Sequence, residues 1–274
     1  MGVSDFERVV LRSGESSIRE LRSGEIMHPG LGPRREAELL YVEQTRLAAR
    51  LTDGKPGPVR VLDVGLGAAT NALAILRCSQ RVTGRPLELT SLEHDEGPLR
   101  LALGEPDAFP LQAEYRAPLE ALLEGGEIRL GRMRWRWPRG DALEQLAILG
   151  ATQDILCFDP FSPEANPRLW TEEALGRFRA VLAPGGILST YSASTRTRVT
   201  LLLAGFWVGA GRAAAAKTET TVASDGPEAL ERPLGRRWLE RWRRSTARAP
   251  HGAELTLDLE ERIRAHPQFA GKAR

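Results

Sequence analysis

The stretch from Val59 to Asn71 reads Val-Arg-Val-Leu-Asp-Val-Gly-Leu-Gly-Ala-Ala-Thr-Asn. A short apolar run ends at Asp63, glycines follow at positions 65 and 67, and an alanine-rich segment begins at once. A strand, a tight turn and a helix in this order open many nucleotide-binding α/β domains. Gly65 permits a turn that a Cβ would strain, and Gly67 lets the main chain approach a ligand. The stretch therefore predicts a nucleotide-like ligand without saying which one.

The composition is that of an ordinary globular protein. The 274 residues are enough for a sizeable core, with 42% hydrophobic and 27% charged residues. A net charge of +2 implies no general affinity for nucleic acid, so any basic surface has to be local. Cys78 and Cys157 lie in apolar segments, which predicts reduced core cysteines and a cytoplasmic protein. We expect no signal peptide, no membrane span and, from the spacing of His, Cys and Asp, no metal site.

We expect three regions along the chain: an N-terminal extension (1–58), an α/β core (59–224) and a basic helical tail (225–274). In the extension, Pro and Gly predict a loop from Met27 to Pro33, and apolar spacing predicts one helix from Glu36 to Leu51. His28, in that loop, either contacts a substrate or has no chemical role.

The second strand of the core is predicted from Pro86 to Asp95, where alternating apolar residues end in acids. Glu93 lies 26 residues beyond Gly67, at the tip of this strand. A carboxylate there can accept hydrogen bonds from both hydroxyls of a ribose, whereas the alternative is a solvated glutamate. Beyond it, the pattern predicts a helix from Gly97 to Leu103 and an irregular segment from Pro106 to Pro118.

The segment from Glu127 to Trp137 alternates apolar residues with arginines, which predicts a strand or hairpin with one basic face. Such a face suits RNA, and it equally keeps an edge strand soluble. Asp141 then precedes a helix that ends near Leu149. Its carboxylate can cap that helix, accept from an adenine amine, or do both.

The most informative stretch runs from Asp159 to Thr171, directly after a buried strand predicted at Asp154 to Phe158. Asp159 and the Pro160 carbonyl fall at the carboxyl edge of the sheet, where ligands bind in open α/β folds. Three prolines in eight positions stiffen the loop. Two acceptors beside the aromatic ring of Phe161 suit a target amine. A purely structural loop is the alternative.

The remaining chain predicts a helix ending before Ala183-Pro184-Gly185-Gly186, a fifth strand at Ile187 to Ser192, and a helix from Thr195 to Leu203. Two last strands are expected, one in Gly205 to Val208 and the other in Lys217 to Ala223. This alternation resembles the S-adenosylmethionine-dependent methyltransferases of class I. The resemblance implies a Rossmann-like α/β fold, a seven-stranded, mostly parallel sheet with helices on both faces.

Within that superfamily, the loop Asp159-Pro160-Phe161-Ser162-Pro163, followed by Asn166-Pro167 and Trp170, resembles the MnmC-like family. That family methylates 5-aminomethyl-2-thiouridine at the wobble position of tRNA, and it carries Asp-Gly-Phe-Ala-Pro or Asp-Pro-Phe-Ser-Pro before Asn-Pro and Trp. The similarity extends from about Ser13 to Ser224. Pro160 stands where some members have glycine, a difference that would reshape the pocket.

The resemblance implies S-adenosyl-L-methionine as cofactor and a site for each ligand. Asp159 would face the amine as the catalytic residue, and it would orient the amine rather than act as a strong base. The residues expected to bind the cofactor are Asp63, Gly65, Gly67, Asn71, Glu93, His94, Asp141 and Ala142. The residues expected to bind the substrate are Pro160, Phe161, Ser162, Asn166 and Trp170.

The implied activity is conversion of the 5-aminomethyl group of a wobble (2-thio)uridine in tRNA to 5-methylaminomethyl. Two-domain members also carry a flavin-dependent oxidase, but this chain has no second dinucleotide motif, so we expect methylation only. A separate flavin oxidase or an upstream tRNA-modifying enzyme would supply the amine. The alternatives are a methyltransferase of the same fold acting on a small-molecule or protein amine, and a non-catalytic binding protein.

The tail carries seven arginines and two glutamates between positions 231 and 250. Trp238 and Trp242 are four residues apart, so they share one stripe of a helix. Such a helix either presents arginine to RNA phosphates or is a packed terminal helix with a solvated face.

Overall fold

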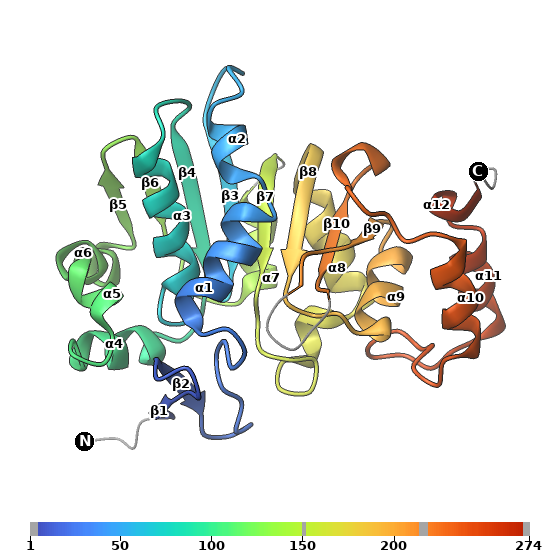
Figure 1. Cartoon of the computed structure of the whole chain (residues 1–274), viewed down its shortest axis with the longest axis horizontal. Helices are drawn as coiled ribbons and strands as arrows, with labels where there is room; N and C mark the ends of the chain where they lie inside the picture. The colour runs from blue at the N-terminus through green and yellow to red at the C-terminus, as the bar shows by residue number, and fades with distance from the viewer. Residues whose placement is uncertain (1–4, 150–151, 214–218, 271–274) are drawn as a thin grey trace.

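The computed structural model describes residues 5–149, 152–213 and 219–270. An eight-stranded sheet forms its centre, with strand order β5-β6-β4-β3-β7-β8-β10-β9 (Figure 1). Strands β6, β4, β3, β7 and β8 are parallel, β5 is antiparallel to β6, and β10 is antiparallel to both β8 and β9. The strands of this sheet are β3 (Val59–Val64), β4 (Leu87–Leu92), β5 (Glu127–Leu130), β6 (Met133–Arg136), β7 (Gln153–Phe158), β8 (Leu182–Thr190), β9 (Trp207–Ala210) and β10 (Thr221–Ser224).

The chain enters the sheet at its centre. It builds outward from β3 through β4 to β6, then returns to the other side of β3 as β7 and continues to β8. The strand order therefore reverses between β3 and β7. Crevices outside the carboxyl ends of parallel strands at such a reversal bind ligands in open α/β sheets.

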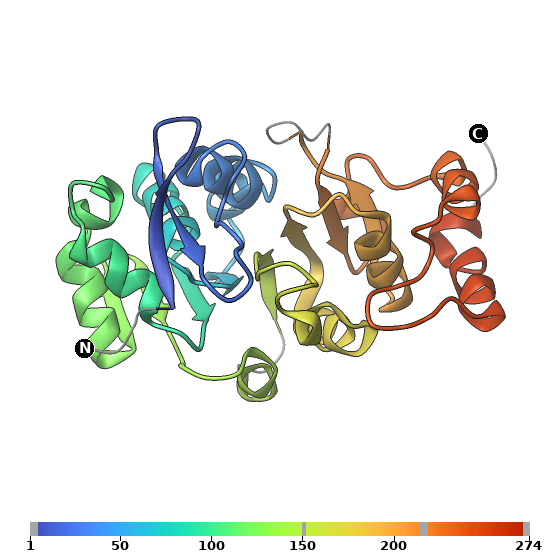
Figure 2. The ribbon, with the colours of Figure 1, turned by 90° about the horizontal axis from the view of Figure 1, so that it is seen from below.

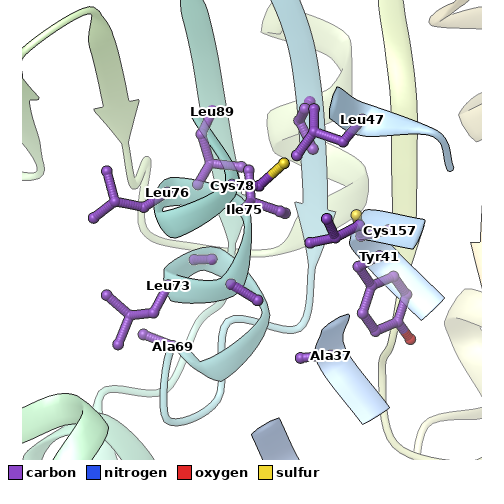
Figure 3. Packing of buried hydrophobic residues seen from close by; sticks show 14 of the residues in the cluster. Ala37, Tyr41, Leu47, Ala69, Leu73, Ile75, Leu76, Cys78, Leu89 and Cys157 are labelled. Atoms are coloured by element: carbon purple, nitrogen blue, oxygen red, sulfur yellow. The ribbon is translucent and has the colours of Figure 1, made fainter. Parts of the chain in front are cut away.

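Helices cover both faces of the sheet, so the central strands are buried nearly throughout. Alternate residues of β3 point to opposite cores: Val61 belongs to one cluster and Leu62 to the other. Figure 3 shows the first core, in which Tyr41 and Leu73 come from helical segments on either side of Cys78 and Cys157. Both cysteines are free and buried, as the apolar context predicted.

The helices of the core and its N-terminal extension are α1 (Pro33–Ala37), the π-helix η1 (Glu38–Glu43), α2 (Leu47–Leu51), α3 (Thr70–Arg81), α4 (Gly97–Gly104), α5 (Pro110–Glu114), α6 (Arg116–Gly125), α7 (Ala142–Leu149), the 3-10 helix η2 (Pro167–Trp170), α8 (Glu172–Ala180) and α9 (Thr195–Leu203). Those of the C-terminal segment are η3 (Pro227–Ala229), α10 (Arg236–Arg244), α11 (Leu257–Arg264) and α12 (Pro267–Ala270). Among the described residues, no helix has the length and apolar character needed to cross a membrane.

A separate two-stranded hairpin, β1 (Phe6–Val10) and β2 (Ser16–Glu20), lies across the lower end of the sheet (Figure 2). Phe6 and Ile18 pack with Ala102 and Phe109 in a small third core, which fixes the hairpin against α4 and the start of α5. The hairpin therefore roofs the carboxyl edge of the strands.

The single helix expected from Glu36 to Leu51 is wrong. The structure has α1, a π-helical turn and α2, with Arg46 in the left-handed region at φ 56°. The wide π-turn frees the Leu40 carbonyl, which accepts a 2.7 Å hydrogen bond from Ser189 Oγ on β8. This long-range partner replaces the helical bond, and local periodicity gives no sign of it.

Three other expectations need correction or completion. The segment Pro106 to Pro118 contains α5 and the start of α6, because Pro110 and Pro118 fall in first turns, where proline costs no helical hydrogen bond. The fold class is confirmed, but the sheet has eight strands because the arginine-rich segment forms the hairpin β5–β6. The last strand begins at Thr221, and the expected start at Lys217 lies outside the described residues.

Candidate active site

A cleft of about 1430 Å³ opens where the carboxyl ends of the central strands meet the roofing hairpin. One wall follows β3 and β4, from Gly65 to Thr70 and from Glu93 to Asp95; the opposite wall runs from Asp159 to Phe161 after β7. The loop from Ile26 to Pro29 lies over both walls. The cleft is therefore at the carboxyl edge of the sheet, where the sequence placed Asp159, and it coincides with the strand-order reversal.

The glycine turn closes the cleft floor. Gly65 has φ 93°, and a Cβ added there would lie 2.6 Å from the carbonyl oxygen of Asp159. Gly67 has φ 50°, and its Cβ would lie 3.2 Å from Met27 Sδ in the roof. Both positions combine a left-handed backbone with a close neighbour, which only glycine tolerates without strain. The glycine turn therefore packs directly against the Asp159 backbone of the opposite wall.

Glu93 lies at the tip of β4, facing the glycine turn. One of its oxygens accepts from the backbone N–H groups of His94 at 2.9 Å and Asp95 at 3.0 Å, and the other accepts from Gly67 N at 3.4 Å. Its side chain is 14% exposed. The carboxylate is thus held in place at the cleft wall. His94 is 75% exposed, and its hydrogen bond to Glu93 raises the pKa of the imidazole.

Asp63 and Asn71 lie beneath the cleft rather than on its surface. Asp63 is fully buried and accepts from Ser91 Oγ at 2.8 Å, while its Oδ1 has no partner among the described residues. Burial raises the pKa of Asp63 to about 8, against the lowering effect of the Ser91 hydrogen bond. Asn71 donates from Nδ2 to Asp159 Oδ2 at 2.7 Å. Both residues therefore act on the cleft through other residues and do not line it.

Asp141 caps α7, one of the two roles that its position suggested, and the role toward an adenine amine stays a prediction. Its Oδ1 accepts from Leu143 N at 2.9 Å and Glu144 N at 3.2 Å, which caps α7. Its Oδ2 lies 3.0 Å from Arg168 Nη1, and Asp141 and Ala142 both line the cleft. The cap fixes the carboxylate near the glycine wall.

Asp159 is the buried acid of the opposite wall, with a side chain only 10% exposed. Besides the bond from Asn71, its Oδ2 lies 3.8 Å from His28 Nε2. Burial raises the pKa of Asp159, and the charge of His28 offsets part of that rise. The carboxyl is therefore a stronger proton acceptor than an exposed aspartate.

His28 bridges two acids in the cleft roof. Its Nδ1 lies 3.4 Å from Glu36 Oε1, and its Nε2 faces Asp159. Burial lowers the pKa of His28, but Asp159 and Glu36 raise it, and the net pKa lies above the ordinary value. The backbone has φ 48°, uncommon for a non-glycine residue and frequent at functional sites. The sequence left its role open, and the structure places it against Asp159.

The loop after Asp159 is tied down at several points. The Pro160 carbonyl accepts from Tyr191 Oη at 3.1 Å, so this acceptor already has a protein donor. Ser162 donates from both its backbone N, at 2.9 Å, and its hydroxyl to the carboxylate of Glu25. Pro160, Phe161, Ser162 and Asn166 all line the cleft.

Trp170 is a correction to the expected substrate set. It is fully buried and does not line the cleft. Its Nε1 donates to the Phe161 carbonyl at 2.9 Å, and its ring packs edge-on against Phe158 with centroids 4.9 Å apart. Trp170 therefore holds the loop from inside the core, because a fully buried ring has no surface for a ligand.

Sequence reasoning missed several cleft residues: Glu25, Met27, Gln112 and Tyr191. Glu25 lies 137 residues before its partner Ser162, and Tyr191 follows β8 by one residue. The position of Tyr191 at a strand end was a usable signal. No local pattern marks Glu25, since its role depends on how the hairpin folds over the sheet.

The arginine-rich hairpin β5–β6 does not present its aromatic rings. Trp135 and Trp137 are buried, and Arg134 pairs with Glu127 at 2.7 Å. Arg129 and Arg132 remain exposed. The hairpin therefore carries arginines on one face, as the alternation predicted, and buries its aromatic rings on the other.

Comparisons with known proteins agree with this geometry. Residues 113–226 match a family described as S-adenosyl-L-methionine-dependent methyltransferase. The chain is 28% identical over 230 residues to the tRNA 5-methylaminomethyl-2-thiouridine biosynthesis bifunctional protein MnmC of Methylibium petroleiphilum, covering 78% of this chain and 34% of that protein. The protein of the same name from Pseudomonas fluorescens (strain Pf-5) is 31% identical, covering 62% of this chain and 28% of that protein. The chain thus spans about a third of the length of these relatives.

A solved structure, MNMC2 from Aquifex aeolicus, superposes with a TM-score of 0.75 and 27% identity, covering 95% of this chain and 84% of that one. The fold, the cleft and these matches define an S-adenosyl-L-methionine-dependent methyltransferase of class I. Within that class, the chain is similar to the MnmC proteins and to MNMC2.

Proposed function

We propose that this methyltransferase transfers a methyl group to the aminomethyl group of a wobble uridine in tRNA, giving 5-methylaminomethyluridine or its 2-thio form. The observation that carries the proposal is a buried carboxylate, Asp159, held by Asn71 and His28 on the cleft wall opposite the glycine turn. The names of the MnmC relatives, which refer to biosynthesis of tRNA 5-methylaminomethyl-2-thiouridine, support the choice of acceptor.

The glycine wall fits S-adenosyl-L-methionine. Gly65 and Gly67 leave the floor free of side chains, Glu93 offers a fixed carboxylate for ribose hydroxyls, and Asp141 offers one for an adenine amine. His94 and Ala142 flank these acids along the same wall. Asp63 supports this wall from below through Ser91, whereas Asn71 bonds to Asp159 on the opposite wall. When bound, S-adenosyl-L-methionine supplies an electrophilic methyl group on a sulfonium.

The opposite wall suits an amine. A primary alkylamine has a pKa near that of lysine, about 10.4, so it arrives largely as an ammonium ion. Asp159 can accept an N–H hydrogen bond from that ion and orient the nitrogen toward the glycine wall. Because burial raises the pKa of Asp159, the carboxylate also favours removal of the proton that blocks the nitrogen lone pair. His28 holds Asp159 from the roof and partly balances its charge.

The volume of the cleft supports two ligands at once. Sites for a single small molecule commonly measure about 300–1,000 Å³, whereas this cleft measures about 1430 Å³. A cofactor and an inserted nucleoside therefore fit together. Unstacked bases of single-stranded loops are the usual targets of sequence-specific RNA recognition, and a wobble uridine is such a base. A separate flavin oxidase or another upstream enzyme would supply the aminomethyl group.

Tritiated S-adenosyl-L-methionine, incubated with tRNA from cells that lack the modification, tests the proposal. Nucleoside analysis after digestion should place the label in a wobble uridine as the 5-methylaminomethyl derivative. Label in another nucleoside or in no RNA would contradict it. Transfer to free alkylamines or protein lysines without any to tRNA would favour the small-molecule or protein acceptor instead.

A further inference from the structure

Helix α10 carries five exposed arginines: Arg236, Arg237, Arg241, Arg243 and Arg244. They cover its outer side because the inner side is fixed by Trp238 and Trp242, which are 6% and 1% exposed. Glu240 is the one acidic residue of the helix. The result is a concentrated positive surface, called here the α10 arginine face, on a protein with little net charge.

The helix that carries this face is firmly docked. Trp242 Nε1 donates to the Arg248 carbonyl at 3.1 Å, and Trp238 stacks on Phe269 with centroids 6.1 Å apart and planes 8° apart. Both tryptophans belong to the second core of the sheet. The arginines therefore project from a fixed helix, which lowers the entropy cost of ordering them when a ligand binds.

Among the residues that the structure describes, these arginines have no acidic partners, whereas three arginines that follow in the chain do. Arg248 and Arg264 both pair with Glu260, at 2.7 and 3.0 Å, and Arg262 pairs with Glu172. None of the five arginines of the α10 arginine face has a carboxylate within 4.0 Å in the described part of the chain. The surrounding surface is neutralised by ion pairs, and this face is not.

Helix stability accounts for only part of the arrangement. Cations favour the last turn of a helix and are unfavourable in the first, where Arg236 and Arg237 lie. The N-cap residue, Gly235, makes no side-chain cap, and the first turn has no acid. Arg237 and Arg241 are like charges four residues apart, which also destabilises a helix. Arg241, Arg243 and Arg244 lie in the last turn, where cations stabilise a helix, so helix stability leaves only Arg236 and Arg237 unexplained.

We infer that the α10 arginine face binds the phosphate backbone of the RNA substrate, an inference that rests on the proposed function. A guanidinium group can donate two parallel hydrogen bonds to a phosphate. An arginine without an acidic partner can do so without first breaking a salt bridge. A membrane surface is disfavoured because the tryptophans that would insert are already buried in the core. No α10 residue lines the cleft, and Figures 1 and 2 place α10 at the end of the molecule opposite α4–α6. The face therefore binds RNA outside the nucleoside site.

The test compares two pairs of exposed arginines in the full chain. Arg237→Gln with Arg241→Gln removes charge from the α10 arginine face; Arg129→Gln with Arg132→Gln removes the same charge from the β5–β6 hairpin. The affinity for unmodified tRNA is measured by fluorescence anisotropy across a salt series. We expect the α10 pair to weaken binding roughly tenfold or more at ~0.1 M salt and to reduce the salt slope by about 2. The hairpin pair should leave both nearly unchanged.

Melting temperature and S-adenosyl-L-methionine affinity should match the wild type in both variants, since neither pair lines the cleft. Unchanged tRNA binding in the α10 variant, or an equal loss in the hairpin variant, would overturn the inference. So would an α10 effect seen only with an acidic partner protein or anionic vesicles. Salt-sensitive tRNA binding that depends on α10, with no methyl transfer, supports this inference while the proposed function fails. Wobble-uridine labelling with tRNA affinity independent of α10 overturns this inference while the proposed function holds.

Discussion

The two walls of the cleft are built in different ways. The glycine wall consists of turns that directly follow strands β3 and β4, and its contacts, such as Gly67 with Glu93, join neighbouring strands. The Asp159 wall is assembled from distant segments: Ser162 is bound by Glu25, 137 residues earlier, and Asp159 faces His28. One wall is a local supersecondary motif, and the other exists only after the N-terminal hairpin has folded over the sheet.

This difference separates two functions that a methyltransferase has to combine. A fixed local motif suits a cofactor common to many enzymes, because it depends on few residues outside itself. A wall made from distant segments can change with the acceptor without disturbing the cofactor site. We therefore expect substitutions in the two walls to affect different measurements, and the following variants test that separation.

Asp159→Ala should give the largest effect. It removes the group that orients the amine, so the transfer rate should fall by roughly 10²–10⁴-fold. Affinity for S-adenosyl-L-methionine should stay within about twofold, because Asp159 belongs to the other wall. Single-turnover transfer and calorimetric titration measure the two quantities. Asp159→Asn, which keeps the volume, guards against a folding defect; near-normal turnover in both variants would refute the assigned role.

Gly65→Ala should damage both walls together. The new Cβ would lie 2.6 Å from the Asp159 carbonyl, in a backbone with φ 93°. Gly57→Ala is the matched control, because Gly57 has φ 79° and nothing within 4 Å of its Cβ position. Cofactor affinity and transfer rate should both fall at least tenfold for Gly65→Ala and stay near wild type for Gly57→Ala. Equal behaviour of the two variants would show that only backbone strain matters.

Glu93→Gln should affect the glycine wall alone. Loss of charged hydrogen bonds to ribose hydroxyls is expected to cost about 1.5–3 kcal/mol, or roughly 10- to 150-fold in the dissociation constant of S-adenosyl-L-methionine. Saturating cofactor should restore most of the transfer rate. Exposed Glu124 on α6 provides the control as Glu124→Gln. A rate that stays low at saturation would mean that Glu93 also acts in the chemical step.

Glu25→Gln should have a smaller effect, limited to the acceptor. The segment that follows β2 would lose its charged contact with the loop at Ser162, so the loop becomes less ordered. We expect a few-fold rise in KM for tRNA with unchanged cofactor affinity. Glu7→Gln, which breaks only an exposed pair with Arg19 on the same hairpin, serves as control. An equal rise of KM in both variants would mean that the loss of any acidic charge in this N-terminal region has the effect, and that the contact with Ser162 is not its cause.

Asp63→Asn should show itself in the pH dependence of stability. Burial raises the pKa of Asp63 from its ordinary 3.8 to about 8, so the folded protein keeps a proton that the unfolded chain releases. Between these values, rising pH therefore destabilises the wild type relative to the variant, and the difference is complete above about pH 8. In thermal melts without cofactor, the melting temperature of the wild type should fall relative to that of the variant as the pH rises from 4 to 8.5. Parallel curves would mean that Asp63 is ionised when buried.

The sequence predicted the glycine wall more completely than the Asp159 wall. Gly65, Gly67, Glu93 and Asp141 could be placed because each follows a strand whose end is visible in the apolar pattern. Trp170 was misassigned because a motif residue can serve its loop from inside the core, and motifs do not report burial. The π-turn at Leu40 escaped notice because its cause, Ser189, is a long-range partner.

The sequence by itself determined the strand, turn and helix alternation, the position of the cleft and the resemblance that suggests the chemistry, since these depend on periodicity, glycine and short motifs. Only the tertiary structure decided what surrounds Asp159. His28 and Asn71 meet its carboxylate because the hairpin, the π-turn and α3 pack against one sheet edge. Tertiary structure also decided that the α10 arginines have no acidic partner in the described ranges, because an ion pair depends on which side chains approach in space. The stretch from Val59 to Asn71 therefore specifies the glycine wall that we propose for the cofactor, and contacts between distant segments shape the wall that we propose for the acceptor.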